Sequence, residues 1–448
     1  MLGSRVRGAV FRGLWPRLPE PQWAPRRRRL CAASAGAAAG GAAPPDAIAR
    51  TTPVVDYASP PAAIDRKRRE LSELAPGGLR KAAFFAAAAP LVWLAGAAGS
   101  AGLLAKAGKG APPAALRAPF EVCEEFVEVN GVKLHCVSPG PRRNRGKPLM
   151  LFLHGFPELW FSWRYQMQEF ADDYDVVAVD QRGYNDSSKP PGIASYRLAQ
   201  LARDVQALVA ALGHERCTLV AHDWGGVVAW TVAGMYGTDL LDRLIVMGLP
   251  HLGVGLTNMD WAQMQRSSYI LLFQAPALPE AMLTADGAAM MDASFVDGPF
   301  ALQNPGAMTK EDVDWYKAAV LKPGAATAML NYYRAFMRTL TLANQEGDGE
   351  VWRALRARID VPTLLLHGEK DPALGMSLLE GVEAAFPEGG LEAKVLLSCS
   401  HWVQQDYPLQ VNGIMREWEK KVERRRGAAA GGAAAGVAAA GNGGGSGG

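Results

Sequence analysis

Short apolar runs alternate with longer segments of helical period between residues 120 and 425. The helical segment at 197–213 places Leu and Val three or four residues apart and ends at Gly213. An alternating segment at 121–137 carries Asn130-Gly131 and predicts a hairpin with a type I′ turn. Buried strands are predicted for the apolar runs at 148–154, 175–180, 217–223, 244–247, 362–367 and 393–397. Because strands separated by helices form parallel sheets, we predict an α/β fold with a mostly parallel, eight-stranded sheet and helices on both faces.

A long stretch without a strand pattern separates the runs at 244–247 and 362–367, and it is rich in Met, Tyr, Phe and Pro. We predict that residues 251–345 form a helical cap over the carboxyl ends of the strands, where open α/β sheets bind ligands. The core would then consist of a first part, 120–250, and a second part, 346–425.

Both ends of the chain are compositionally biased. Residues 1–50 are rich in Arg, Ala and Pro, with eight Arg and one acid in the first 33 residues. This composition indicates a disordered organellar transit peptide; a disordered extension without a targeting role is the alternative. Residues 51–80 are expected to be a linker, and the Gly/Ala-rich residues 427–448 a disordered tail.

An uncharged run of 24 residues, 82–105, lies between Lys81 and Lys106. Its length can cross a bilayer, so residues 81–106 are predicted to be a transmembrane anchor; a buried or interfacial helix is the alternative. We therefore expect a membrane-associated protein of the chloroplast or mitochondrion, with the endoplasmic reticulum as the alternative. The topology and oligomeric state stay open.

The charge and the cysteine spacing argue against nucleic-acid binding and against a metal site. The net charge is only +3, and its basic excess lies at the N-terminus, so nucleic acid is not an expected partner. The five cysteines show no metal-ligand spacing, which favours reduced thiols and no metal site.

The strongest chemical signal is the segment Ala221-His222-Asp223-Trp224-Gly225, which follows a predicted strand and opens a predicted helix. Small residues two positions before and after Asp223 allow a sharp strand-to-helix turn that exposes the central side chain. Asp223 is therefore the candidate nucleophile.

Two further candidates follow in the order that such a site requires. Asp371 and then His401 each come after a predicted strand, as the acid and the general base of a triad would. His154-Gly155 follows an earlier strand and allows a backbone turn into the site. The backbone N–H groups of Phe156 and Trp224 are therefore the expected oxyanion donors.

An Asp nucleophile predicts a particular reaction. Attack by a carboxylate on an sp³ carbon gives an ester, which water can hydrolyse with His401 as base and Asp371 orienting the imidazole. The leaving group could be an epoxide oxygen, which needs O–H donors such as Tyr, or a halide, which would favour indole N–H donors.

Four motifs, HGFPELWFSWRYQ (154–166), DQRGYNDSS (180–188), HDWGG (222–226) and CSHW (399–402), resemble the epoxide hydrolase family of the α/β-hydrolase superfamily. The similarity covers about residues 120–420 and is greatest to membrane-anchored vertebrate-type members. It implies an α/β-hydrolase fold and cofactor-free hydration of small apolar epoxides to vicinal diols, with lipid epoxides as candidate substrates. Asn185 replaces the family's usual Gly, but Asn tolerates a left-handed backbone.

The resemblance also implies that two cap tyrosines, Tyr269 and Tyr333, polarise the epoxide oxygen. We expect the substrate pocket to be lined by His154, Pro157, Trp160 and Phe273. Two alternatives remain open: a haloalkane dehalogenase-like hydrolase, and a non-catalytic, membrane-tethered binding protein on the same scaffold.

Overall fold

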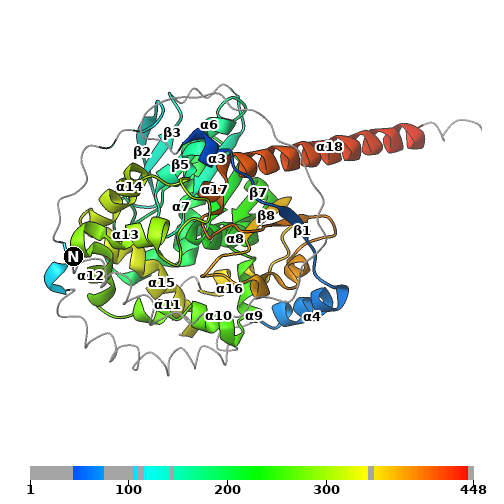
Figure 1. Ribbon diagram of the computed structural model, residues 1–448. Helices are drawn as coiled ribbons and strands as arrows, with labels where there is room; N and C mark the ends of the chain where they lie inside the picture. Colours follow the sequence, from blue (N-terminus) through cyan, green and yellow to red (C-terminus); the bar gives the residue numbers. More distant parts are fainter. Residues whose placement is uncertain are drawn as a thin grey trace, which may run out of the picture.

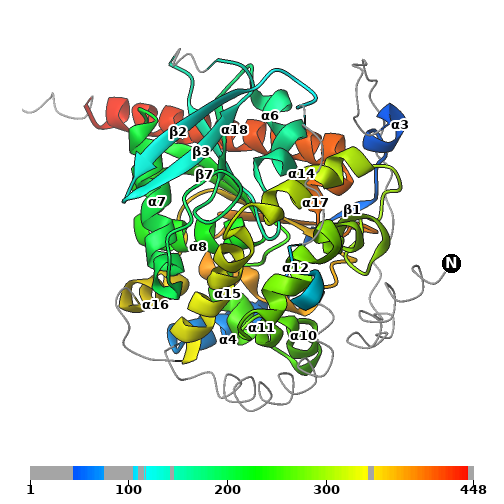
Figure 2. The ribbon, with the colours of Figure 1, turned by 90° about the vertical axis from the view of Figure 1, so that its left-hand side faces the viewer.

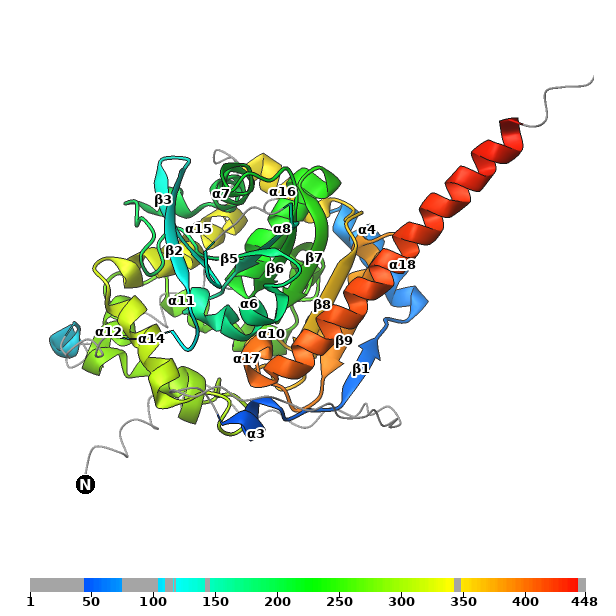
Figure 3. The ribbon, with the colours of Figure 1, turned by 90° about the horizontal axis from the view of Figure 1, so that it is seen from above.

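A single nine-stranded sheet forms the centre of the molecule (Figures 1 and 3). The computed structural model describes residues 44–74, 104–108, 116, 118–141, 146–341 and 348–441. The strands lie in the order β1-β9-β8-β7-β6-β4-β5-β3-β2. Their bounds are β1 Val54–Tyr57, β2 Cys123–Val129, β3 Val132–Ser138, β4 Leu149–Leu153, β5 Asp175–Asp180, β6 Cys217–His222, β7 Leu241–Met247, β8 Thr363–Gly368 and β9 Leu391–Leu396.

The strands from β5 through β4, β6, β7 and β8 to β9 are parallel, which confirms the predicted α/β architecture. The hairpin β2–β3 is antiparallel, and Asn130 (φ 47°) and Gly131 (φ 72°) both have the positive φ of a type I′ turn. Eight strands were expected, and the ninth is β1, which pairs antiparallel with β9.

Helices cover both faces of the sheet. α7 (Leu198–Ala211), α8 (Trp224–Tyr236) and α16 (Asp348–Arg356) pack together on one face, and α6 (Arg164–Phe170) and α18 (Pro408–Gly441) pack on the other (Figure 3). Because the central strands are covered twice, β4, β5, β6 and β8 are buried at every position. Shorter elements complete the core: η1 Trp160–Trp163, η2 Ile193–Tyr196, η3 Gly237–Asp239, η5 Met376–Leu379, η6 Val382–Ala385 and α17 Val403–Asp406.

The described part of the segment between β7 and β8 contains helices and no strand. Figure 2 shows several of its helices side by side on one flank of the molecule. The helical elements are α9 Leu252–Thr257, α10 Trp261–Arg266, α11 Tyr269–Leu272, α12 Leu278–Ala288, α13 Met290–Asp292, η4 Ala293–Asp297, α14 Lys310–Leu321 and α15 Ala325–Thr341. We call residues 251–341 the cap.

The segment expected to be a linker is instead built into the body. β1 adds to the sheet edge, and α4 (Pro61–Ser72) packs against α9 and η6. Part of the N-terminal extension is also ordered, since α3 (Pro45–Ile48) buries Ala47. We call residues 44–57 the strap. A short strand beside prolines carries too little periodicity to stand out from a linker.

The two terminal predictions differ in outcome. The tail was expected to be disordered, but α18 continues to Gly441 and projects away from the body (Figure 3). Its many alanines favour a helix, which outweighs the glycines. The predicted anchor lies outside the described residues up to position 103, as does the transit peptide up to position 43. Within the described residues, no helix has the length and apolar character needed to cross a bilayer.

Candidate active site

Asp223 lies at the turn between β6 and α8 with φ 48° and ψ −117°, a backbone conformation that few residues other than Gly adopt. The turn is this sharp because its neighbours are small. A Cβ on Gly225 would lie 2.2 Å from the Leu153 carbonyl oxygen, and one on Gly226 would lie 3.0 Å from Val246 Cγ1. The glycines therefore let α8 start directly against the sheet, with the Asp223 carboxylate at its N-terminus.

The three triad residues meet at the carboxyl edge of the sheet. His401 Nδ1 lies 2.7 Å from Asp371 Oδ2, and His401 Nε2 lies 3.6 Å from Asp223 Oδ2. The other oxygen of Asp371 accepts from the N–H groups of Ala373 and Leu374, at 2.8 and 2.9 Å. Asp371 is thus fixed by the backbone and orients one imidazole nitrogen, which leaves the other facing Asp223.

The three triad residues shift one another's pKa values. Burial alone would lower the pKa of His401, but the Asp371 charge and hydrogen bonds to both carboxylates raise it well above its ordinary value. Burial would likewise raise the pKa values of Asp223 and Asp371, but contact with His401 lowers both. Each of the three side chains therefore favours the charged form of its neighbour.

One expected oxyanion donor contacts the nucleophile directly. The Phe156 N–H donates to Asp223 Oδ1 at 2.8 Å. Gly155 makes this approach possible, since a Cβ there would lie 2.5 Å from Asp223 Cβ. The Trp224 N–H is the first in α8, where no earlier turn of helix can accept from it. The partial positive charge of the helix N-terminus favours negative charge at this position.

The two predicted tyrosines come together above Asp223. Tyr269 begins α11 and Tyr333 lies in α15, and their ring centroids are 6.0 Å apart. Tyr333 also packs edge-on against Phe156 and Trp224, with centroids 5.2 and 4.8 Å away. Burial raises the pKa of both phenols, so each keeps its proton at neutral pH and can donate it. The adjacent Tyr332 faces away, with its hydroxyl on the Arg182 carbonyl.

The four expected pocket residues divide into two groups. Phe273 packs against both tyrosines, with centroids 5.3 and 5.0 Å away, and Pro157 follows Phe156 in a cis peptide bond. Trp160 instead packs against Phe161 and Trp315.

His154 does not offer a polar group to a pocket. Its Nδ1 bonds the Gly155 carbonyl, and its Nε2 accepts from the Gln181 N–H. Both nitrogens are thus used by the backbone, so its assignment to the pocket is corrected: the ring supports the turn beneath the site.

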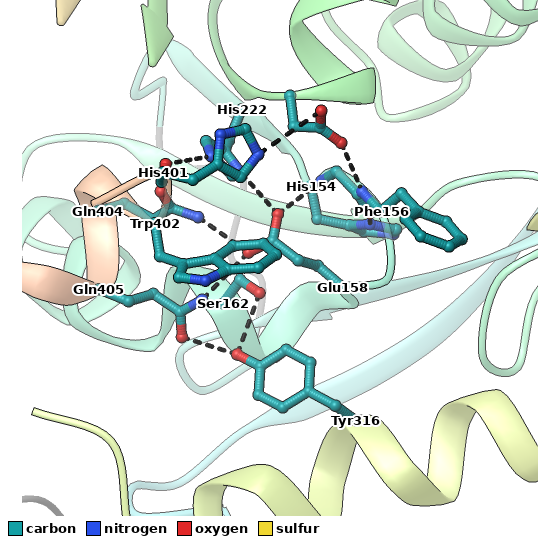
Figure 4. A network of polar contacts seen from close by, with 12 residues as sticks. His154, Phe156, Glu158, Ser162, His222, Tyr316, His401, Trp402, Gln404 and Gln405 are labelled. Atoms are coloured by element: carbon teal, nitrogen blue, oxygen red, sulfur yellow. Dashed lines mark hydrogen bonds and ion pairs between the residues drawn. The ribbon is translucent and has the colours of Figure 1, made fainter. Parts of the chain in front are cut away.

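Glu158 is a component that the sequence analysis missed (Figure 4). This fully buried carboxylate accepts from four donors: Gly155 N–H (2.8 Å), His222 Nδ1 (2.6 Å), Gln404 Nε2 (2.9 Å) and Gln405 Nε2 (3.0 Å). His222 Nε2 lies 2.9 Å from the His401 carbonyl, which can only accept. Burial alone would raise the pKa of Glu158, but its contacts with His222 and with the Gly155 N–H lower it. The pair links the Gly155 turn to the backbone of His401.

Arg334 was also missed, although it follows Tyr333 directly. Its guanidinium donates to the carbonyls of Phe273 (2.9 Å) and Ala275 (2.7 Å), and it is paired with Glu280 (2.8 Å). These carbonyls lie just beyond α11. The Arg334 guanidinium therefore fixes α11, which carries Tyr269, against α15, which carries Tyr333.

An aspartate at a strand–helix turn, an Asp–His pair beside it and a backbone N–H group that donates to it are the arrangement of an α/β-hydrolase site. Residues 148–408 match the family described as alpha/beta hydrolase fold. The chain is 35% identical to "Epoxide hydrolase 4" of Mus musculus over 324 residues, which cover 71% of this chain and 86% of the relative. It is 36% identical to "Epoxide hydrolase 3" of Xenopus tropicalis over 295 residues, covering 65% and 76%.

A solved structure agrees with these relatives. The crystal structure of Bacillus megaterium epoxide hydrolase in complex with an inhibitor matches with a TM-score of 0.57 and 31% identity, covering 66% of this chain and all of that one. The chain belongs to the epoxide hydrolase family of α/β-hydrolases, and it is an epoxide hydrolase.

Proposed function

We propose that this enzyme opens small apolar epoxides to vicinal diols through a covalent ester on Asp223. In the first step a carboxylate oxygen of Asp223 attacks an oxirane carbon while the C–O bond breaks. Tyr269 and Tyr333 donate to the departing oxygen, which becomes the first hydroxyl of the diol. In the second step His401 takes a proton from water, and the water oxygen adds to the ester carbonyl. The tetrahedral intermediate then breaks its bond to the diol oxygen, which takes up a proton and leaves as the second hydroxyl, so the Asp223 carboxylate is restored.

The observation that carries this proposal is a pair of phenols, Tyr333 buried and Tyr269 partly buried, that face a carboxylate. An epoxide oxygen develops negative charge as its ring opens, and it needs donors of suitable acidity nearby. Phenols whose protons are retained by burial supply them without a change of conformation. The N–H groups of Phe156 and Trp224 would hold the oxyanion during ester hydrolysis.

The mechanism also accounts for the choice of Asp. An attacking Ser would leave an ether that water and His401 could not release, whereas the ester of Asp223 has a carbonyl carbon open to attack. Near the site Phe156 packs against Phe273, and Trp224 packs against Tyr333, so aromatic rings surround the tyrosines. Lipid epoxides and aryl epoxides both fit such a lining.

The proposal is tested with styrene oxide in oxygen-18 water over several turnovers, followed by digestion and mass measurement of the Asp223 peptide. Attack of labelled water on the ester carbonyl places the label in the carboxylate. Unlabelled carboxylate after several turnovers would exclude the ester. Tyr269→Phe and Tyr333→Phe should each slow ester formation, and the double variant should nearly abolish it.

A haloalkane dehalogenase activity would need no phenol donor. Ester formation from a 1-haloalkane that survives the double Tyr→Phe change, with no turnover of epoxides by the unaltered enzyme, would favour that alternative.

A further inference from the structure

Asp406 ends α17, five residues after His401, and its side chain is fully buried. Its Oδ1 accepts from the Asn304 N–H at 2.7 Å, and its Oδ2 accepts from the Ser400 N–H at 2.7 Å and the Gln303 N–H at 3.2 Å. One donor therefore comes from the residue before His401, and two come from the cap. We call Gln303, Asn304, Ser400 and Asp406 the polar joint.

A second contact ties the other side of His401 to the same part of the cap. The Trp402 indole N–H donates to the Phe300 carbonyl at 2.7 Å and to the Ser294 carbonyl at 3.1 Å. Trp402 thus bonds the cap directly, and Ser400 is linked to cap residues 303 and 304 through Asp406. The position of the His401 backbone is set by the cap as well as by the sheet.

The strap reaches the polar joint from outside. The Asn304 amide donates to the Ala47 carbonyl at 2.8 Å and to the Asp406 carbonyl at 2.7 Å. Farther along, Thr52 exchanges two hydrogen bonds with the Gln410 amide, at 2.9 and 2.7 Å. The strap, the cap and the His401 loop therefore meet at one buried carboxylate and one buried amide.

We propose that Asp406 is a positioning residue for the second half-reaction: it holds the His401 loop against the cap so that the imidazole faces the Asp223 ester. This inference rests on the proposed two-step function. The Asp406 carboxylate accepts from Gln303, Asn304 and Ser400, so it acts on His401 through Ser400.

The effect should fall on ester hydrolysis alone. Asp223 is held by the β6–α8 turn, and the tyrosines are held by α11, α15 and the Arg334 guanidinium, none of which includes the polar joint. In the second step His401 must direct a water at the ester carbonyl of Asp223. His401 Nε2 lies 3.6 Å from Asp223 Oδ2, so little displacement of the ring is tolerated. A displacement near 1 Å in such a geometry lowers a rate by about 100-fold.

The test uses Asp406→Asn in the full-length chain with styrene oxide. The amide keeps the size of the side chain but turns an N–H₂ group toward backbone N–H donors. Acid-quenched samples give the amount of Asp223 ester by mass, from its build-up and from its decay. We expect ester decay to slow by about 10- to 100-fold, with ester formation within about threefold of the unaltered enzyme.

A slower second step also makes kcat and KM fall together, because the ester accumulates. A general loss of folded enzyme would lower kcat and leave KM unchanged. The matched control is Asp175→Asn. This buried carboxylate lies at the first residue of β5, so it is at the amino end of the parallel strands, whereas the site lies at their carboxyl end. It pairs with His214 at 2.9 Å. It should lower the melting temperature without changing the ratio of the two steps.

Asn304→Ala provides the second variant. It removes the side-chain hydrogen bonds to the Ala47 and Asp406 carbonyls but keeps the charged carboxylate of Asp406. It should slow ester decay by about threefold to tenfold. Unchanged ester decay in either folded variant, or an equal slowing of both steps, would overturn the role of Asp406. If the unaltered enzyme and His401→Gln both fail to form any ester on Asp223, the proposed function fails instead.

Discussion

Gly155 offers a direct test of how the nucleophile is held. An added methyl group would lie 2.5 Å from Asp223 Cβ and 2.6 Å from its Oδ1. Carbon atoms in contact normally stay about 3.5 Å apart, so Gly155→Ala forces a separation of about 1 Å. Either the carboxylate leaves the Phe156 N–H, or the turn that carries this N–H moves away. Both outcomes break the 2.8 Å contact between donor and nucleophile.

A displacement of that size should slow ester formation by about 100-fold, and overpacking should cost about 1–3 kcal/mol of stability. Single-turnover mass measurement of the Asp223 ester and urea unfolding report the two quantities. Gly255→Ala is the control, because this buried glycine lies in α9 with no atom within 4 Å of an added methyl. Removing a helical glycine there should raise stability by up to about 1 kcal/mol without changing the rate. Ester formation in Gly155→Ala within threefold of the unaltered enzyme would refute the reasoning.

Three further predictions concern the charged groups. His401 binds its proton more tightly when folded, which stabilises the fold below pH ~6.5 and is lost as the pH rises through the raised pKa. His401→Gln should therefore lower the melting temperature more at pH 6 than at pH 9; equal losses would contradict this. Arg334→Lys keeps the positive charge but loses the guanidinium hydrogen bonds to the Phe273 and Ala275 carbonyls, so kcat/KM for styrene oxide should fall about tenfold. An unchanged kcat/KM would show that these hydrogen bonds do not position α11. Glu158→Gln turns an N–H₂ group toward buried donors from Gly155, Gln404 and Gln405 and should cost about 1–3 kcal/mol in urea unfolding, a loss that a surface Glu→Gln change would not produce.

The sequence was sufficient for the parallel part of the sheet, since four of its six strands, β4, β5, β6 and β8, are largely apolar runs buried at every position. It also placed Asp223, Asp371 and His401 correctly just after their strands, and the structure brings them together. Asn185 illustrates a finer success: it has φ 37°, the left-handed backbone that Asn was expected to tolerate.

β1 could not be predicted by the same reasoning. It is a four-residue edge strand, and its pairing with Leu391–Leu396 joins positions more than 300 residues apart. An edge strand with partly exposed positions shows neither a continuous apolar run nor a clear alternation. Only the tertiary partner distinguishes such a segment from a linker.

The buried polar network escaped prediction for a related reason. The spacing of Gly155 and Glu158 could have indicated a side chain that caps a turn. The other donors to Glu158 come from His222, Gln404 and Gln405, which local spacing does not connect to it. A buried charge is favourable only when all its partners are present, and those partners are assembled by the fold.

The position of His401 between Asp371 and Asp223 has a consequence for the order of events. Only one of these two carboxylates becomes a neutral ester in the proposed reaction. When Asp223 is alkylated, its contribution to the raised pKa of His401 disappears, and a proton on the imidazole becomes easier to release. The ring would thus be an acid in the empty enzyme and a base once the intermediate exists. Formation of the intermediate itself would prepare the group that destroys it, with no rearrangement of the protein between the two steps.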